Sequence, residues 1–285
     1  MRFAFIEAKK AEYPVSVLCR VLWVERSGFY AWRSREESNH AVDDRRLAIE
    51  VRAAFEESKR RYGSPRVYRV LRRQGVKVGR HRVARLMRDQ KLQARRRRKF
   101  VATTNSKHSM PTPPNIVRRH FEVEEPDRVW AGDVTYLPTG EGWLFLAVLL
   151  DLYSRRVVGW ALSEHNDEAL TLSALEMALD QRRPASGLVH HSDRGTTYAS
   201  GEYQDVLARH GLVCSMSRKG DCWDNAVVES FFSTLDIECA REQPFSTRRH
   251  ARREVSDYIL SFYNPTRLHS YLGYMSPLEF ERAAH

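Results

Sequence analysis

The order of apolar segments after residue 128 is the feature that most restricts what this chain can fold into. Three strand-like segments come first and are joined by short turns, at residues 129–137, 143–154 and 155–162. Helix-like and strand-like segments then alternate, at residues 168–181, 187–191, 201–210, 212–216 and from Trp223 onward. Short turns predict antiparallel pairing, whereas strands separated by helices predict parallel pairing. This order predicts an α/β domain of the ribonuclease-H-like fold.

The sequence pattern of residues 1–100 predicts helices and no strands. Residues 1–40 form a small unit of short helices, and residues 43–59 form an amphipathic helix. Two further helices begin at Ser64, which can cap its helix, and at Gly79. A helix, a short glycine-containing turn and a second basic helix make the helix-turn-helix pattern, whose second helix can lie in the DNA major groove. We therefore expect a basic, all-α, helix-turn-helix-like region over residues 41–100.

Charge is divided unevenly between the two parts of the chain. Residues 1–120 hold 31 Lys or Arg and 11 Asp or Glu, whereas residues 121–285 hold 16 and 25. Residues 60–100 alone hold 17 Lys or Arg and one acid, Asp89. Arg-rich faces are often merely solvated, but this density on a folded segment favours a polyanionic partner, DNA. The predicted DNA-binding residues here are Arg66, Arg69, Arg73, Arg80, Arg82, Arg85, Arg88, Arg95, Arg96, Arg97 and Arg98.

Composition argues against several other classes of protein. No apolar run approaches the roughly 18 residues of a membrane span, and charged residues crowd the N-terminus where a signal peptide would be apolar. The four cysteines have no Cys-x-x-Cys spacing, so we expect no zinc site or disulfide framework, and a reducing cytoplasm. Four prolines and few large apolar groups predict a linker over residues 101–127. The expected divisions are 1–40, 41–100, 101–127, a catalytic core over 128–240, and a C-terminal helical extension over 241–285.

Three acids occupy positions where two strands and the last helix of the predicted core could converge. Asp133 lies inside the first strand, Asp193 directly follows the fourth, and Glu229 lies in the first turns of the last helix. Each alone could be an ordinary structural, turn or surface residue, but an acid inside an apolar strand costs desolvation unless something compensates it. Together, three carboxylates would form a hard oxygen site for Mg²⁺ or Mn²⁺, and would repel one another without the metal. Two such ions could activate water or a DNA 3′-hydroxyl and stabilise the leaving oxygen of a phosphodiester.

Three further residues carry weaker signals. Asn225 could cap the last helix or help to hold the backbone of the metal site, and capping is favoured. His191 precedes Asp193 by two residues and would share its face if the strand continued, so it could touch DNA, approach the metal shell, or be a buried core histidine. Asp151 is expected to be a structural acid, hydrogen-bonded at the end of the sheet.

The second-frame protein (OrfB) of the insertion-sequence-three family of bacterial transposases resembles this chain in four segments: HSDRGTTYAS, MSRKGDCWDNAVVESFFSTL, FLAVLLDLYSRRVVGWALS and YNPTRLHSYLGYMSPLEFE. The 35 residues between Asp193 and Glu229 also match the D-35-E spacing of retroviral integrases and related transposases. The front half agrees with the segment that precedes the core in this family, through YPVSVLCRVLWVERSGFYAWRSR and YGSPRVYRVLRRQGVKVGRHRVARLM. The resemblance thus covers nearly the whole chain.

The resemblance implies an integrase-type core whose catalytic and metal-binding triad is Asp133, Asp193 and Glu229, holding Mg²⁺ or Mn²⁺ as two ions. It implies a DDE polynucleotidyl transferase that cleaves and joins DNA strands at transposon ends, and so acts in transposition, integration and recombination. The implied partners are transposon terminal inverted repeats, target DNA, further copies of this chain in a synaptic complex, and the upstream-frame protein (OrfA), separate or fused. The expected location is the bacterial cytoplasm, at the nucleoid, with no membrane partner. Because the chain shows no heptad run, we expect the family's upstream zipper to lie outside it.

One position departs from the pattern of the family. Asp236 stands seven residues after Glu229, where the family usually has Lys or Arg, and helical spacing puts both acids on one face. The family's cation would contact DNA near the scissile phosphate, so an acid there should repel it. Either a neighbouring base such as Lys219 substitutes, or the position tolerates change, or activity is reduced.

Two other functions fit part of the sequence. A non-catalytic DNA-binding protein, such as a regulator of transposition or an inactivated remnant, would keep the basic region and the fold, and Asp236 is its best support. A ribonuclease or general nuclease of the same fold would share the triad but has less use for two helical DNA-binding segments. Cleavage of labelled terminal-repeat DNA in Mg²⁺ or Mn²⁺ would discriminate between the first function and a transposase.

Overall fold

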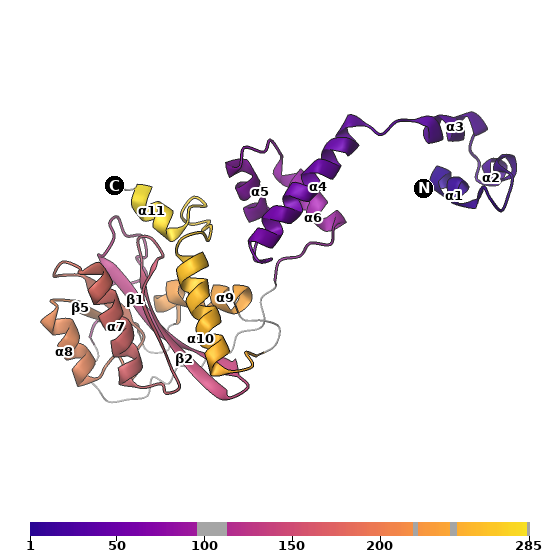
Figure 1. Cartoon of the computed structure of the whole chain (residues 1–285). Coiled ribbons are helices and arrows are strands. Elements are labelled where there is room, and N and C mark those ends of the chain that lie inside the picture. Colours follow the sequence, from indigo (N-terminus) through magenta and orange to yellow (C-terminus); the bar gives the residue numbers. More distant parts are fainter. Residues whose placement is uncertain (96–112, 219–221, 240–243, 284–285) are drawn as a thin grey trace.

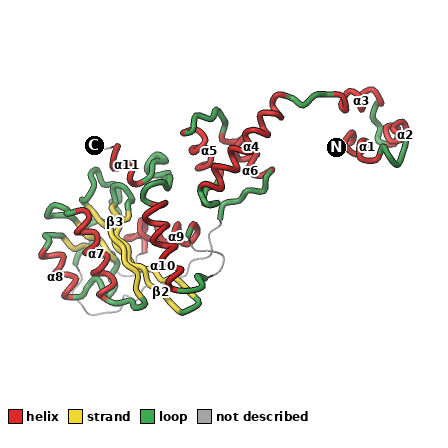
Figure 2. Tube along the Cα trace, in the orientation of Figure 1, coloured by secondary structure: helices red, strands yellow, loops and turns green. Residues whose placement is uncertain are grey.

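The computed structural model describes residues 1–95, 113–218, 222–239 and 244–283 (Figure 1). Three short helices form an N-terminal unit: α1 (Arg2–Lys9), α2 (Val15–Val21) and α3 (Arg26–Ser34). This unit has its own small apolar core around Ile6, Leu18 and Phe29. It stands apart from the rest of the chain at one end of the molecule (Figure 2).

The helix-turn-helix-like region is a compact unit of three helices, α4 (Asn39–Glu57), α5 (Ser64–Arg73) and α6 (Arg80–Asp89). Its core contains Val51, Phe55, Val67, Leu71 and Val83. The start of α5 differs from the sequence prediction, because Gly63 occupies the N-cap position and Ser64 is already helical. Ser38 does cap α4, since its Oγ accepts a hydrogen bond from Ala41 N at 3.2 Å. The apolar spacing therefore predicted these helices correctly, although one cap was misplaced.

The core sheet has the strand order β3-β2-β1-β4-β5. The strands are β1 (Val129–Thr139), β2 (Gly142–Asp151), β3 (Val157–Ser163), β4 (Val189–Ser192) and β5 (Val213–Met216). Strands β1, β2 and β3 pair antiparallel, whereas β4 pairs parallel with both β1 and β5. The predicted α/β order is thus confirmed, including the change from antiparallel to parallel pairing once helices separate the strands.

Helices cover both faces of this sheet (Figure 1). On one face, α7 (Glu168–Arg182) and α8 (Gly201–Arg209) pack on apolar residues of the strands. The approach of α7 is close, because a Cβ at Gly159 would lie 2.2 Å from Ala174 O, and position 159 therefore requires glycine. On the other face, α9 (Ala226–Glu238) follows the short 3₁₀ turn η1 (Cys222–Asn225) and packs on the sheet beside α10 (Arg248–Asp257).

The C-terminal extension packs directly on the core. After α10 it forms the π-helical turn η2 (Tyr258–Tyr263) and the last helix α11 (Pro277–Ala283). Tyr258 and Tyr263 are buried in the same cluster as the strand residues Leu150 and Val157. Asn264 holds the edge strand, since its Oδ1 accepts from Val157 N at 3.0 Å and its Nδ2 donates to Val157 O at 2.9 Å.

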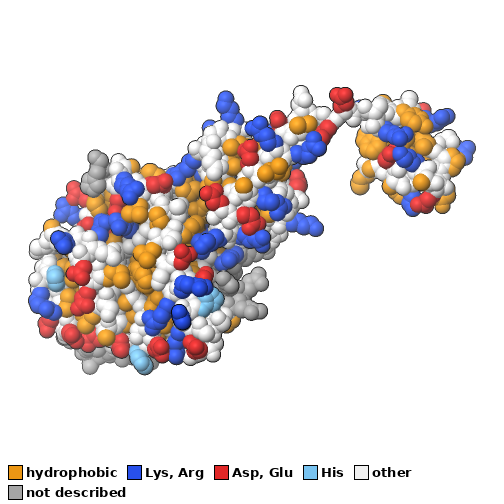
Figure 3. All heavy atoms as spheres, in the orientation of Figure 1, with side chains coloured by type: hydrophobic (Ala, Val, Ile, Leu, Met, Phe, Trp, Pro, Cys, Tyr) orange, Lys and Arg blue, Asp and Glu red, His pale blue; other side chains and the backbone are white. Residues whose placement is uncertain are grey.

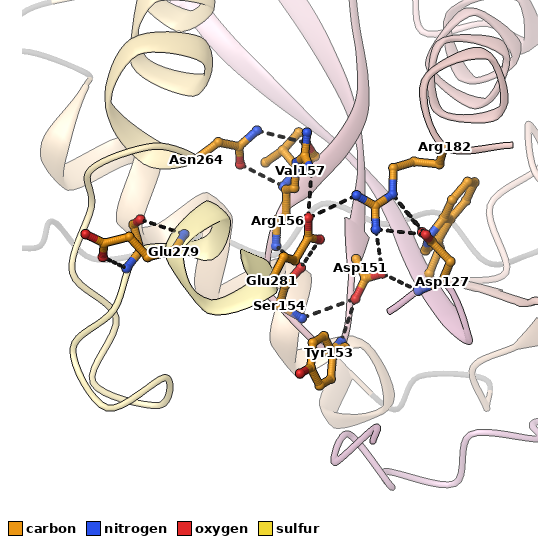
Figure 4. Close-up of polar contacts among 12 residues, drawn as sticks. Asp127, Asp151, Tyr153, Ser154, Arg156, Val157, Arg182, Asn264, Glu279 and Glu281 are labelled. Carbon is orange, nitrogen blue, oxygen red and sulfur yellow. Dashed lines mark hydrogen bonds and ion pairs between the residues drawn. The ribbon is translucent and has the colours of Figure 1, made fainter. Parts of the chain in front are cut away.

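A polar network joins α11 to the end of the sheet (Figure 4). Glu281 accepts hydrogen bonds from Arg156 and Arg182, at 2.6 and 3.0 Å. Asp151 lies beside this pair and accepts from the backbone nitrogens of Asp127, Tyr153 and Ser154. Burial raises the pKa of Asp151 to about 6, against the lowering effect of these backbone donors. Asp151 is therefore the structural acid at the sheet's end that the sequence predicted.

The described helices include none that is both long and apolar enough to cross a membrane.

Candidate active site

Two of the three predicted acids lie side by side on neighbouring parallel strands, Asp133 within β1 and Asp193 directly after β4. Gly132 of β1 is paired with Ser192 of β4, so Asp133 and Asp193 each follow this pair by one residue. Each carboxylate accepts one hydrogen bond from nearby backbone, Asp133 from Val134 N and Asp193 from Gly195 N, both at 2.8 Å. A Cβ at position 195 would lie 2.9 Å from Asp193 Oδ1, so glycine permits this tight turn after the strand.

Glu229 brings the third carboxylate from α9. Its neighbours Val228, Phe231 and Phe232 are buried against the sheet, which fixes the rotation of the helix. The pKa of Asp133 is raised well above its usual range, first by burial, then by the negative charge of Asp193, and also by that of Glu229. Burial also raises the pKa of Glu229. The fold therefore brings the three acids that the sequence singled out into one region of shared negative charge.

This region has the chemistry of a divalent-cation site. Carboxylate oxygens are the hard ligands that Mg²⁺ and Mn²⁺ prefer, and a cation would relieve the repulsion that raises the pKa of Asp133. In the described parts of the chain, however, no group of three or more His, Cys, Asp or Glu side chains is placed so that it could hold a metal ion as it stands. The three carboxylates fit such an ion in their chemistry, although the described side chains are not arranged to hold one.

His191 and Asn225 make hydrogen bonds that join the strands of the site to the turn before α9. His191 is fully buried, and its two ring nitrogens lie 2.9 Å from Ser215 Oγ and from Asp224 O. Asn225 donates from Nδ2 to Gly132 O at 3.1 Å, directly before Asp133. The expected capping role of Asn225 is wrong, because its side chain makes no cap hydrogen bond at the start of α9. Both residues instead tie the turn before α9 to the strands, and His191 takes the buried-histidine alternative, since β4 ends at Ser192.

Asp224 is a supporting residue that the sequence reasoning missed. Its side chain is 0% exposed and accepts hydrogen bonds from Arg218, Arg119 and Asn115. Hydrogen bonds from the Arg218 side chain are the largest cause of a pKa well below the usual range of an Asp. The sequence offered one signal for it, an acid directly before the glutamate-bearing helix. Its arginine partner at position 119 comes from a segment that was predicted to be a linker.

Tyr198 is a second residue that the sequence reasoning missed. Its ring is buried against the active-site strand, since a Cβ at Gly132 would lie 3.5 Å from the Tyr198 hydroxyl. Burial raises the pKa of this phenol well above its usual range, and the charges of Asp133 and Asp193 raise it further. Tyr198 therefore stays neutral beside the two carboxylates.

The arginines predicted to bind DNA are divided between two tasks. Several make contacts within the protein: Arg73 pairs with Glu279 at 3.1 Å, while Arg82 and Arg85 pair with Asp44 at 2.7 and 2.6 Å. Arg69 stacks over the Tyr274 ring at 4.6 Å. Figure 3 shows Lys and Arg side chains mixed with Asp and Glu over the helix-turn-helix-like region.

The remaining predicted arginines are likewise either bound within the protein or exposed to solvent. Arg66 donates to Leu268 O at 2.9 Å, and Arg95 donates to Glu238 O at 3.0 Å. Arg80 and Arg88 on α6 are exposed and form no ion pair with any described residue, which leaves them available to phosphates. Arg96, Arg97, Arg98 and Lys219 lie outside the described residues.

Glu238, at the end of α9, is the centre of the contact between the helix-turn-helix-like region and the core. Its carboxylate is 3% exposed and accepts from Arg267 Nε and Nη2, at 2.8 and 2.9 Å, and from the Tyr258 hydroxyl at 2.9 Å. Arg61 donates to the Glu238 carbonyl at 3.0 Å, and Tyr62 Oη lies 3.0 Å from Leu268 N. Thus the helix that carries Glu229 also holds the helical region on the core.

Asp236 lies on the exposed side of the same helix. It forms no ion pair with a described residue, and Arg241, a potential partner, lies outside the described part of the chain.

Three family models match the chain over most of its length. Integrase core domain models match residues 123–222 and 210–277, and a model of an HTH-like domain matches residues 42–100. The catalytic core domain of the HTLV-2 integrase in complex with magnesium is a structural neighbour, with a TM-score of 0.42 and 17% identity, over 55% of this chain and 97% of that one. The fold and the family models define an integrase-core protein with a helix-turn-helix-like region in front.

Curated relatives identify the family. The chain is 43% identical over 283 residues to the transposase InsF for insertion sequence IS3A of Escherichia coli K12, covering 99% of this chain and 98% of that protein. It is 42% identical over 268 residues to an uncharacterized 31 kDa protein of insertion element IS600 from Shigella sonnei, covering 94% and 98%. The chain therefore belongs to the IS3 family of transposases, as the sequence segments predicted.

Proposed function

We propose that this chain cuts and joins DNA strands at transposon ends, as a divalent-metal-dependent DDE polynucleotidyl transferase. The observation that carries the proposal is the convergence of Asp133, Asp193 and Glu229 in an integrase-type core, where two of these charges raise the pKa of the third. Two bound Mg²⁺ or Mn²⁺ ions would activate water or a DNA 3′-hydroxyl and stabilise the leaving oxygen.

The roles of the protein groups follow from their positions. Asp133 and Asp193, on neighbouring strands, would share ligation of the ions, and Glu229 would complete the set from α9. Asn225 and His191 hold the turn before α9 against the strands, and so position Glu229 relative to the two aspartates. No covalent bond between protein and DNA is required, because water or a DNA hydroxyl is the attacking group.

The basic helical region would bind the DNA. Exposed arginines of α6 are suited to phosphate contacts, and α6 is the second helix of the helix-turn-helix-like pattern. The proposed ligands are the terminal inverted repeats of the element and the target DNA, held by several copies of this chain in a synaptic complex. The upstream-frame protein, separate or fused, is the further partner, and the site of action is the bacterial cytoplasm at the nucleoid.

A non-catalytic DNA-binding protein is the second candidate function. Asp236 favours it, because this exposed acid on the helix of Glu229 would repel a DNA phosphate. A general nuclease of the same fold would have less use for the helical region, because hydrolysis does not need a separate DNA-binding region.

The test is strand cleavage and strand transfer on labelled terminal-repeat DNA with Mg²⁺ or Mn²⁺. Asp193→Asn should lower both rates by a factor on the order of 10³ or more, because the neutral amide is a poor ligand for these ions. Binding of the same DNA should persist, since the helical region is intact. Asp205→Asn, an exposed position on α8, is the matched control and should keep full activity. A parent chain that binds but never cleaves would instead support the non-catalytic function.

A further inference from the structure

A second charged site lies on another side of the helix that carries Glu229. A cavity of about 330 Å³ is bounded by α9, by the segment 263–271 and by Arg66 of α5. The residues of α9 that line it run from Ala226 to Thr234, and its described lining does not include Asp133, Asp193 or Glu229. The cavity is therefore separate from the carboxylate site, although both are built on α9.

The charged side chains among the described residues that line this cavity are all cationic. Arg66, Arg155 and Arg267 all line it, and they come from α5, from the turn after β2 and from the C-terminal extension. Glu238 offsets one of these charges, since it binds Arg267 directly and lies 3.5 Å from Arg66. His269 adds no charge, because burial and then the three guanidinium groups lower its pKa far below the usual range. The cavity thus keeps a surplus of positive charge.

The three guanidinium groups are not all used up by structural contacts. Arg155 is 8% exposed and donates from Nη2 to Phe121 O at 3.1 Å, while its buried Nη1 has no hydrogen-bond acceptor among the described residues. Its guanidinium carbon lies over the Tyr271 ring, 4.3 Å from the centroid. Ser230, Thr234 and Ser270 add hydroxyl groups to the same wall.

We propose that this cavity binds a phosphate group, carried by the backbone of bound DNA. Planar guanidinium groups that approach from three elements, together with hydroxyls, match the tetrahedral array of phosphate oxygens better than they match one planar carboxylate. The volume admits a phosphate with several waters, at about 30 Å³ for each water. The choice of DNA as the source rests on the proposed function, whereas the phosphate chemistry rests on the cavity alone.

A first experiment measures phosphate binding without DNA. Thermal unfolding of the full chain is followed in potassium phosphate and in potassium chloride at equal ionic strength, with EDTA present. The parent should show a saturable rise of a few degrees in phosphate. Ser270→Asp places a negative charge at this exposed lining position and should remove the rise. Ser173→Asp, an exposed serine on α7, is the matched control and should keep it.

A second experiment identifies the source of the phosphate. Affinity for terminal-repeat duplex is measured by fluorescence anisotropy, and Ser270→Asp should weaken it by about tenfold relative to Ser173→Asp if the ligand is a DNA phosphate. Loss of the thermal rise with unchanged DNA affinity would instead make free phosphate the ligand. The proposal is overturned if Ser270→Asp alters neither measurement, or if Ser173→Asp alters both equally.

These measurements still test phosphate binding if the chain proves not to cut or join DNA. Phosphate binding in EDTA needs no strand transfer, so Asp193→Asn should show the same thermal rise as the parent. A chain without cleavage activity that keeps this rise would refute the catalytic proposal and leave the phosphate site standing.

Discussion

The core and the helix-turn-helix-like region differ in how their charged side chains are arranged. In the core, the acids at positions 133, 193 and 229 come together in one site. In the helical region, basic residues of very similar sequence context separate, since Arg73 and Arg82 bind carboxylates of the protein whereas Arg80 and Arg88 face solvent. Burying a carboxylate costs free energy unless a cation or hydrogen-bond donors compensate it, so few positions in the fold can hold one. A long arginine side chain can reach either a carboxylate or solvent from many positions.

This difference shows that a count of basic residues overstates the surface available to DNA. Arg61, Arg66 and Arg95 bind carbonyl groups or the carboxylate of the core and its C-terminal extension. Leu268 of the extension also enters the apolar core of the helical region. Part of the positive charge therefore serves to hold two regions of one chain together. Variants at Glu238, at Arg80 together with Arg88, and at Asp236 can test the comparison between the core and the helical region.

The largest effect is expected at Glu238. Glu238→Gln removes the charge that faces the buried Arg267, so the free energy of unfolding should fall by about 3–5 kcal/mol, as for other broken buried pairs. Glu279→Gln is the matched control, because its partner Arg73 is exposed and the pair should contribute at most about 1 kcal/mol. Urea unfolding measures both. Equal losses in the two variants would show that the contact at Glu238 does not hold the regions together.

A smaller effect is expected from the exposed arginines of α6. Replacing Arg80 and Arg88 together with Ala should reduce the slope of log affinity against log salt by about 1.8, at roughly 0.9 for each phosphate contact. The control is the double change of Arg73 and Arg82 to Ala, which removes the same charge from residues already paired within the protein. That control should leave the slope nearly unchanged. A reversed order of the two slopes would show that the paired arginines leave their carboxylates to bind DNA.

The smallest effect is expected at Asp236. Asp236→Lys reverses a charge on the exposed side of α9 and should replace repulsion of a DNA phosphate by attraction. Strand transfer should rise by only about threefold to tenfold at low salt, because solvent screens an exposed charge. The gain should shrink as salt increases. Asp205→Lys makes the same change of charge on a different helix, α8, and is the control that should leave strand transfer unchanged. Unchanged strand transfer at low salt would mark position 236 as a tolerated surface site.

The sequence by itself determined the order of elements and the direction of strand pairing, and it singled out the three acids of the proposed site. Periodicity reports which face of each segment is buried, and short turns or intervening helices set the direction of strand pairing. The structure added the register, which pairs Gly132 with Ser192 and so places Asp133 and Asp193 directly after paired residues of neighbouring strands. The family resemblance added the proposed catalytic role of all three acids.

Only the tertiary structure decided which charges meet across long separations in the chain. Asp224 is bound by Arg119, and Arg66, Arg155 and Arg267 line one cavity, although no local pattern links these residues. Periodicity places a side chain on a face but does not name its partner on another element. The partner depends on how helices and loops pack, and burial then selects the pairings that satisfy each charge.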